Sequence, residues 1–206
     1  MAGELPIFEL PMVLLPGELM PLHIFEERYK RMIDHCVSEQ EPFGIVFRDE
    51  DGSARRIGCT ARVTEVLETF EDGRMDIVVT GEEPFKVLER FDRDEYPAGE
   101  IEPVGSGEAD GDDESAADAV REMFAELVER VSGNEPAPEE LADSDAYAIA
   151  SRVELPVETK QRLLELRSED ERMRTLGAAL DALIDTLARS REIAERAKMN
   201  GKVVFG

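Results

Sequence analysis

Tryptophan is absent from the 206 residues, and cysteine and histidine occur only twice each. Cys36 and Cys59 can form at most one disulfide, and a chain of this length buries enough core to fold without one. Both cysteines lie among apolar residues, so we expect two buried free thiols in a reducing compartment. The cysteines, His23 and His35 make none of the spaced motifs of protein metal sites, so we predict no metal and no cofactor.

Basic residues are also scarce. The chain has 24 lysines and arginines against 48 acidic residues, and its formal net charge is −24. Nucleic acids and anionic membrane surfaces bind proteins largely through lysine and arginine, so the charge disfavours both as partners. No apolar run approaches 18 residues, and the first residues lack the pattern of a signal peptide. We therefore expect a cytoplasmic protein that does not enter membranes.

Catalytic motifs are missing from the sequence. The only Gly-Lys pair is Gly201-Lys202, which is followed by Val203 and so does not form a phosphate-binding G-x-x-x-x-G-K-[ST] loop. Neither G-x-S-x-G nor G-x-G-x-x-G occurs. Cys36 follows His35 directly, but adjacent residues on a helix do not face each other, which favours core packing over a thiolate–imidazole pair. We predict that the chain is not an enzyme and has no catalytic residue.

The pattern of residues 1–104 is typical of a small β structure. Residues 6–15 are apolar and interrupted by prolines, which predicts short extended segments at a sheet edge. Apolar residues spaced by three or four predict one short helix within residues 23–37. The turn at residues 71–74 (EDGR) predicts a hairpin. The remaining strands are expected at residues 43–47, 57–70, 75–80, 85–91 and 100–104.

The period of the apolar residues changes in the second half. Residues 105–113 (GSGEADGDD) predict an acidic, glycine-rich linker. Apolar residues then recur at helical spacing, with capping signals that predict a helical bundle over residues 114–200. Its helices are expected at residues 117–131, 144–153, 156–166 and 168–200. The last six residues, 201–206, are expected to be a tail. The fold class is therefore α+β, with a β-rich domain over residues 1–104.

Several ordered motifs resemble the N-terminal domain family of Lon-type ATP-dependent proteases. They are PIFELP at residues 6–11, VLLPG at 13–17, PLHIFEERY at 21–29, FGIV at 43–46, IGCTA at 57–61, GRMDIVVTG at 73–81 and LPVETKQRLL at 155–164. The resemblance covers most of residues 5–190. It implies a small PUA-like β-barrel followed by helices, in a region that helps to select and hold unfolded or tagged substrates and carries no catalytic residue. The chain has no P-loop and no room for the Ser–Lys protease domain of that family.

An apolar segment punctuated by prolines is the candidate binding site. Its large apolar residues are Met12, Leu14, Leu15, Met20 and Leu22. One interpretation is that they cover the bottom of the barrel as part of the core. The alternative is a partly exposed groove for an extended peptide, which edge strands would bind through backbone hydrogen bonds.

The sequence thus favours a non-catalytic module that binds unfolded or tagged polypeptides, as an adaptor or regulator of proteolysis with a protease as partner. Three alternatives stay open, because one fold hosts many functions. PUA-like barrels in other families bind RNA, although the charge of −24 opposes that here. A pocket between the two halves could bind a small ligand or act as an enzyme. The long last helix could also form the interface of a structural homodimer.

Overall fold

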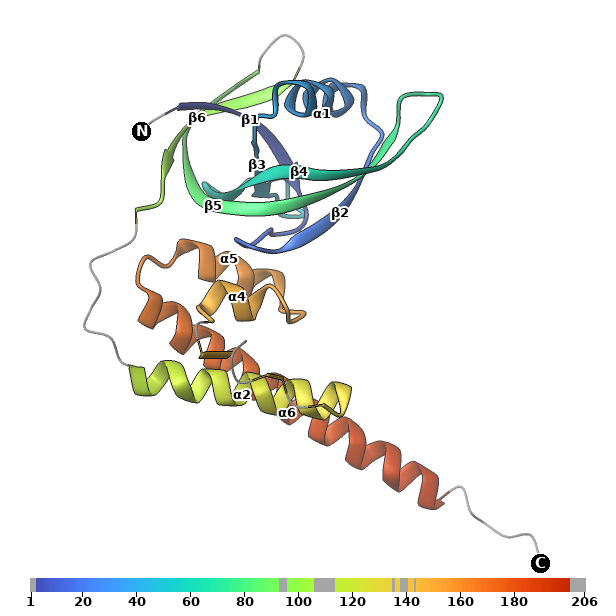
Figure 1. Ribbon diagram of the computed structural model, residues 1–206, viewed down its shortest axis with the longest axis vertical. Coiled ribbons are helices and arrows are strands. Elements are labelled where there is room, and N and C mark those ends of the chain that lie inside the picture. Colours follow the sequence, from blue (N-terminus) through green and yellow to red (C-terminus); the bar gives the residue numbers. More distant parts are fainter. Residues whose placement is uncertain are drawn as a thin grey trace, which may run out of the picture.

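The chain forms an α+β structure in which a β part comes first and a helical part follows (Figure 1). The computed structural model describes residues 3–92, 96–105, 114–134, 136–137, 141–142 and 144–200. We call residues 3–105 the β part and residues 114–200 the helical part. The expected tail at residues 201–206 and nearly all of the expected linker lie outside the described residues. In the described ranges, no helix is both long enough and apolar enough to cross a membrane.

Six strands make up the sheet. They are β1 Gly3–Leu10, β2 Leu19–Ile24, β3 Phe43–Phe47, β4 Ile57–Thr69, β5 Met75–Asp92 and β6 Pro97–Pro103. Their order is β2-β5-β4-β3-β1-β6, and β6 also pairs with β5. Five strands therefore form a closed ring, β5-β4-β3-β1-β6. The sixth strand, β2, is added to β5.

The structure corrects the prediction that residues 6–15 lie at a sheet edge. β1 is paired along its whole length, antiparallel to β6 through residues 3–6 and parallel to β3 through residues 7–10. Pro6 faces Ala98 in the last pair of the first ladder, and Ile7 faces Gly44 in the first pair of the second. The proline, which has no N–H, thus lies where one ladder gives way to the other, so it disturbs neither.

Three other strand predictions also needed correction. Residues 19–24 form the strand β2, for which the sequence patterns had predicted no strand. The expected strands at residues 75–80 and 85–91 are one long strand, β5, which pairs with β2 near its start and with β6 near its end. The expected strand at residues 100–104 begins earlier, at Pro97.

One helix, α1 Glu27–Glu39, covers the β part (Figure 1). Its buried face consists of Tyr29, Met32, Ile33 and Cys36. These side chains belong to the larger of two apolar clusters, together with Phe8 and Ile45. Leu5, Ile7, Val46, Phe85 and Val87 form the smaller one. Neighbouring residues of a strand point to opposite faces, so β1 and β3 contribute to both clusters.

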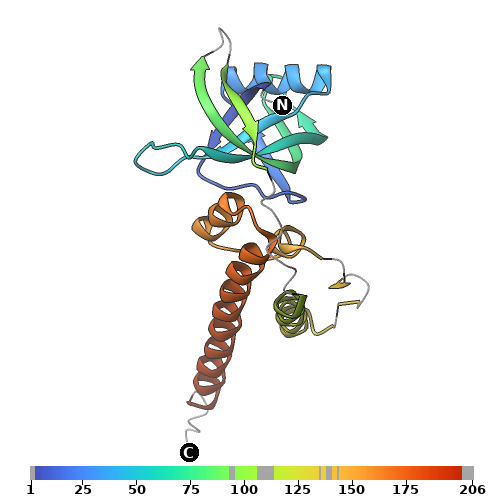
Figure 2. The same cartoon turned by 90° about the vertical axis from the view of Figure 1, so that its left-hand side faces the viewer.

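The described helices of the second half are α2 Glu114–Ser132, α4 Ala146–Ala150, α5 Val157–Glu165 and α6 Glu169–Asn200. They confirm the expected helices to within a few residues. The first half of α6 packs against α2, where Gly177 leaves room for the side chain of Val120. Beyond Leu187 the described side chains of α6 are exposed, and this end of the helix projects from the molecule (Figures 1 and 2).

The helix α5 joins the helical part to the β part (Figure 2). Lys160 forms an ion pair with Glu18, whose other carboxylate oxygen accepts the N–H of Leu15 at 3.0 Å. Next to it, Gln161 donates to the carbonyl of Ile57 at 3.2 Å. On the opposite side, Gly81 brings β5 against the same loop, since a Cβ there would lie 2.1 Å from the carbonyl oxygen of Leu15. The loop of residues 11–18 is thus held between β5 and α5, and one apolar cluster runs through both parts.

Candidate functional site

The cysteines and histidines do not form a reactive centre in the structure. Both thiols are free and buried. Burial raises the pKa of Cys36 to about 11 and also raises the pKa of Cys59, so little thiolate forms near neutral pH. The imidazole of His35 lies 3.7 Å from a carboxylate oxygen of Glu41. Within the described ranges, no three His, Cys, Asp or Glu side chains are close enough to hold a metal ion.

The structure places four of the five candidate site residues in the core. Leu14, Leu15, Met20 and Leu22 are all buried. A peptide could touch these four side chains only if they left the core, so the structure favours their interpretation as core residues. Met12 differs, because 37% of its surface is exposed. Peptide binding by the five together stays a prediction, and only Met12 is open to a partner in this conformation.

Other exposed apolar side chains lie on the β part, beside this segment. Leu19 is 65% exposed and Phe25, directly after β2, is 62% exposed. Val37, Val66 and Leu67 are also exposed. Leu19 and Phe25 were not among the residues that the sequence patterns predicted for the site. The signal was the alternation of residues 19–25, in which Met20, Leu22 and Ile24 are buried and the residues between them are exposed.

Two strand edges of the β part lack a partner strand among the described residues. β2 pairs only with β5, so its other edge is open. β4 pairs with β3 through residues 59–61, and beyond them its outer half pairs only with β5. An open edge presents backbone N–H and C=O groups that another extended chain can pair with. Both edges therefore qualify as binding sites for a polypeptide.

A cavity of about 390 Å³ lies next to the end of β2, and we call it the β1–β2 groove. It is lined by residues 8–11 at the end of β1, by residues 22–26, and by Arg28, Tyr29 and Arg48. Phe8 and Tyr29 are in contact there, with ring centroids 4.1 Å apart. The groove thus lies at the end of a strand with an unpaired edge, beside the exposed ring of Phe25.

Arginines stand at the mouth of this groove. Arg48 and Arg90 both bind Glu9, at 3.1 and 3.3 Å, and a second small pocket next to β6 contains the same three residues. Arg28 binds Glu26 at 3.0 Å, and its guanidinium lies 4.5 Å from the ring centroid of Tyr29. Arg28 on α1, Arg48 just after β3 and Arg90 on β5 thus gather around Glu9 and Glu26, and the first two line the groove.

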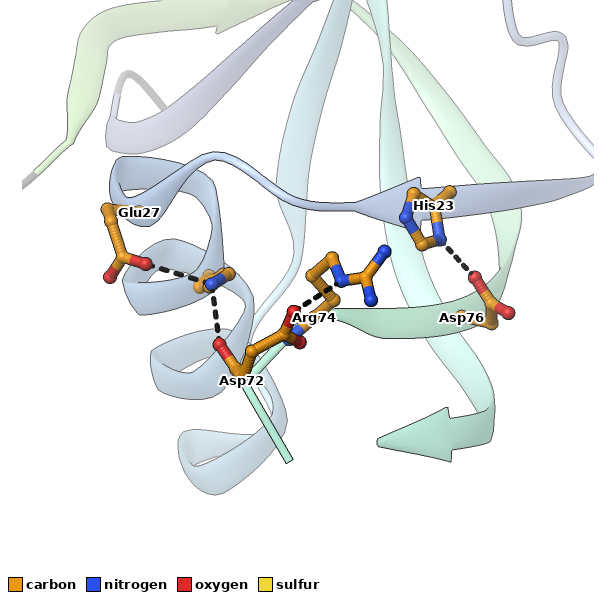
Figure 3. Close-up of polar contacts among 6 residues, drawn as sticks. His23, Glu27, Asp72, Arg74 and Asp76 are labelled. Atoms are coloured by element: carbon orange, nitrogen blue, oxygen red, sulfur yellow. Dashed lines mark hydrogen bonds and ion pairs between the residues drawn. The ribbon is translucent and has the colours of Figure 1, made fainter. Parts of the chain in front are cut away.

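Polar contacts hold the neighbouring elements in place (Figure 3). His23 on β2 lies 2.5 Å from a carboxylate oxygen of Asp76 on β5. Lys30 of α1 donates to Glu27 and to the carbonyl of Asp72 in the β4–β5 turn, both at 2.8 Å. These hydrogen bonds include the one that lowers the pKa of Glu27. The contacts fix β2 against β5 and the hairpin turn against α1.

Two further cavities lie elsewhere on the described surface. A shallow groove of about 510 Å³ lies between the end of α1 and β4, next to Val37 and Val66. A pocket of about 290 Å³ lies between the two parts, where Tyr147 donates its hydroxyl to the carbonyl of Leu163 at 3.1 Å. Burial raises the pKa of Tyr147 to about 12. The carboxylate that lines this pocket is the exposed Glu83.

The sequence matches the family model described as the ATP-dependent protease La (LON) substrate-binding domain, over residues 4–182. This chain belongs to that family. The resemblance inferred from the sequence motifs is therefore confirmed, and the groove, both open strand edges and the joint with α5 all lie within the matched residues.

Relatives of the LON substrate-binding domain family agree with this assignment. The Lon protease of Anaeromyxobacter dehalogenans is 29% identical, over 93% of this chain and 23% of its own length. Lon protease 2 of Myxococcus xanthus is 26% identical, over 93% of this chain and 24% of its own length. The chain thus spans about a quarter of the length of the curated relatives that it matches.

Solved structures of the family share the fold. The N-terminal domain of the Mycobacterium avium complex Lon protease superposes with a TM-score of 0.69, at 20% identity, and the match covers 87% of this chain and 98% of that one. The Lon N-terminal domain protein from Xanthomonas campestris superposes with a TM-score of 0.60, at 23% identity, over 85% of this chain and 98% of that one. At this identity the likeness establishes the fold alone.

Proposed function

We propose that this chain is a non-catalytic module that recognises unfolded polypeptides, and that it serves as an adaptor or regulator of proteolysis with a protease as partner. One observation carries the proposal. Within a family named for substrate binding, the β part exposes apolar side chains beside a strand edge without a partner strand. Unfolded chains offer apolar side chains and unpaired backbone groups, and such a surface can bind both.

The finer architecture is part of the same proposal. The closed ring of five strands supports a PUA-like barrel, and the packing of α6 against α2, α4 and α5 supports a helical bundle. The division into a domain over residues 1–104 and a second one over residues 114–200 stays a prediction. A cytoplasmic location belongs to the proposal as well, supported by two free, buried thiols that suit a reducing compartment.

The proposal is tested with a purified reduced and carboxymethylated protein that cannot refold, and with its native form as the control. Isothermal titration calorimetry should show that the chain binds the unfolded form and ignores the native one. Mass spectrometry of the incubated mixture should show that the unfolded protein stays intact. Equal binding of both forms, or no binding at about 1 mM, would contradict the proposal.

A pair of variants tests whether the β part makes the contact. Phe25→Ser removes an exposed aromatic ring next to β2, whereas Ile193→Ser removes an equally exposed apolar side chain from α6. Because burying such a ring contributes about 1–2 kcal/mol to binding, Phe25→Ser should weaken capture of the unfolded protein by roughly tenfold. Ile193→Ser should bind as the wild type does. Equal losses in both variants would argue against a site on the β part.

A further inference from the structure

We propose that the polypeptide binds as an added strand along the open edge of β2, with an acidic side chain of the bound segment against Arg28 and Arg48. This inference rests on the proposed function and gives it a site, a binding mode and a preferred class of segment. The occupant is an extended stretch of chain that carries an apolar residue and, close to it, an internal aspartate or glutamate.

The backbone of β2 presents free hydrogen-bonding groups along this edge. Gly81 donates its N–H to the carbonyl of Glu18 at 3.0 Å, just before the antiparallel ladder between β2 and β5. This hydrogen bond shows which residues of β2 bond to β5 and which do not. Along an antiparallel ladder, the backbone N–H and C=O groups of successive residues point alternately toward and away from the partner strand. Met20, Leu22 and Ile24 therefore direct these groups toward β5. The N–H groups of residues 19 and 23 and the carbonyls of residues 19, 21 and 23 therefore point away from β5. Pro21 falls on an outward position, where its missing N–H costs no ladder bond.

The open edge of β4 is less suited to receive a strand. Its ladder with β5 shifts register between Val63 and Glu65 and again between Val66 and Glu68. Bulges, charged side chains and prolines on an edge are devices by which proteins block the addition of further strands. β2 has one of them, since the outward Pro21 leaves an added strand only the N–H groups of residues 19 and 23. β2 pairs with β5 without a register shift, and its sequence LMPLHI contains no acidic residue, lysine or arginine. Of the two edges, the structure leaves β2 the more accessible to a strand.

The β1–β2 groove lies where the side chains of an added strand would reach. Side chains of an extended segment alternate between its two faces, so every second one would point to the same side as the groove. Phe8 and Tyr29 line the groove, but both side chains are almost fully buried, so they offer little surface to a peptide. Phe25, at the end of β2, provides exposed aromatic surface at the rim.

Two arginines at the groove are the reason to expect an acidic residue in the bound segment. The side chains of Arg28 and Arg48 are 49% and 50% exposed. Arg48 binds Glu9 through Nη1, and Arg28 binds Glu26 through Nε and Nη2. A guanidinium has five N–H donors, so each arginine has donors left for another carboxylate. Glu26 and Glu9 line the same groove and pair with these arginines, so an acidic side chain would bind by sharing the two guanidinium groups with them.

The backbone contact is tested with His23→Pro and His23→Ala. Both variants lose the imidazole and its contact with Asp76, but only proline also removes the outward N–H of residue 23. The ratio of the two dissociation constants therefore reports on the outer edge of β2 at this residue. The probe is an acetylated and amidated decapeptide of alternating valine and serine with one central glutamate, titrated by calorimetry. We expect His23→Pro to bind it about five- to tenfold more weakly than His23→Ala, because a backbone hydrogen bond is lost and the ring obstructs the edge.

Circular dichroism and thermal melts check that both variants fold. Should His23→Pro unfold, Leu19→Pro against Leu19→Ala repeats the comparison at the other outward N–H. Equal affinities within a folded pair would overturn the added strand. If Leu67→Ser weakens binding of the peptide and His23→Pro does not, the peptide binds at β4. That result would also overturn the proposed strand on β2.

The charge contact is tested with a second decapeptide, in which the central glutamate is replaced by glutamine. The wild type should prefer the glutamate peptide about threefold, as expected for a partly exposed ion pair. The double variant Arg28→Gln, Arg48→Gln should lose this preference. A preference that persists in the double variant, or binding that requires a free C-terminus, would overturn the acidic-side-chain contact.

The unfolded protein used above separates this inference from the proposed function. If the wild type captures that protein, and the proline and arginine variants capture it equally well, the site is wrong and the function stands. If the wild type captures no unfolded protein, both are wrong.

Discussion

The β part and the helical part differ in where they keep their apolar residues. Among the described residues, six large apolar side chains are exposed on the β part, and two, Val131 and Ile193, are exposed on the helical part. The helices turn their apolar faces to each other and to the loop of residues 11–18. The difference suggests a division of labour. The helical part supports the β part at the loop of residues 11–18, and the outer edge of β2, which follows this loop, has no partner strand among the described residues.

The largest effect is expected from a substitution at Gly81, where β5 lies against the loop of residues 11–18. A Cβ at this position would lie 2.1 Å from the carbonyl oxygen of Leu15, so Gly81→Ala must push the loop away from β5. We expect a loss of about 3 kcal/mol in the free energy of unfolding, measured by urea denaturation. Gly3→Ala is the control, because nothing lies near its Cβ. If both variants have wild-type stability, the loop is not held between β5 and α5 as described.

The buried thiols make the core of the β part sensitive to alkaline pH. The pKa of Cys36 is raised from 9.0 to about 11 in the folded protein, so the unfolded chain loses this proton first as the pH rises. The stabilising contribution is complete below pH 9 and is lost between about pH 9 and 11. We expect the free energy of unfolding to fall by about 2 kcal/mol more in the wild type than in Cys36→Ser between pH 8 and 10.5.

Guanidinium denaturation at the two pH values measures this difference. The raised pKa of Cys59 acts in the same direction and should persist in Cys36→Ser, so the variant is expected to keep part of the fall. An identical fall in both proteins would show that Cys36 does not contribute to it.

The variant Lys160→Met tests the contact between the two parts. The ion pair with Glu18 is mostly buried, and its removal leaves a carboxylate that accepts only the N–H of Leu15 among the described contacts. We expect a loss of about 1.5 kcal/mol, less than for a fully buried pair because some water reaches it. Adding Glu18→Gln should recover part of the loss in a double-mutant cycle. Purely additive losses would mean that the two side chains do not interact in solution.

The smallest effect is expected at the projecting end of α6. A chain that ends at Arg189 loses residues whose described side chains are exposed, and with them one surface hydrogen bond from Arg191 to the carbonyl of Arg130, so its free energy of unfolding should change by less than about 0.5 kcal/mol. Capture of an unfolded protein should be unchanged, since the proposed site lies on the β part. A large loss of stability on truncation would show that this end of α6 packs against something that the single chain does not show.

Sequence patterns predicted the helices better than the strands. The capping signals before α5 and α6 and the step of three and four along them depend on neighbours within one helix, and both helices were confirmed. The hairpin turn at residues 71–74 is equally local and was correct. The spacing of Phe25 and Tyr29, by contrast, fits a helix, although Phe25 follows a strand that only its pairing with β5 defines.

The sequence by itself determined the family, the α+β class and the apolar nature of the segment from Met12 to Leu22, because these depend on residue order and local spacing alone. Only the tertiary structure decided that Leu14 and Leu15 are buried between β5 and α5 and that the edge of β2 is open. Burial and pairing depend on partners distant in the chain, such as Gly81 and Lys160, and no local pattern names them.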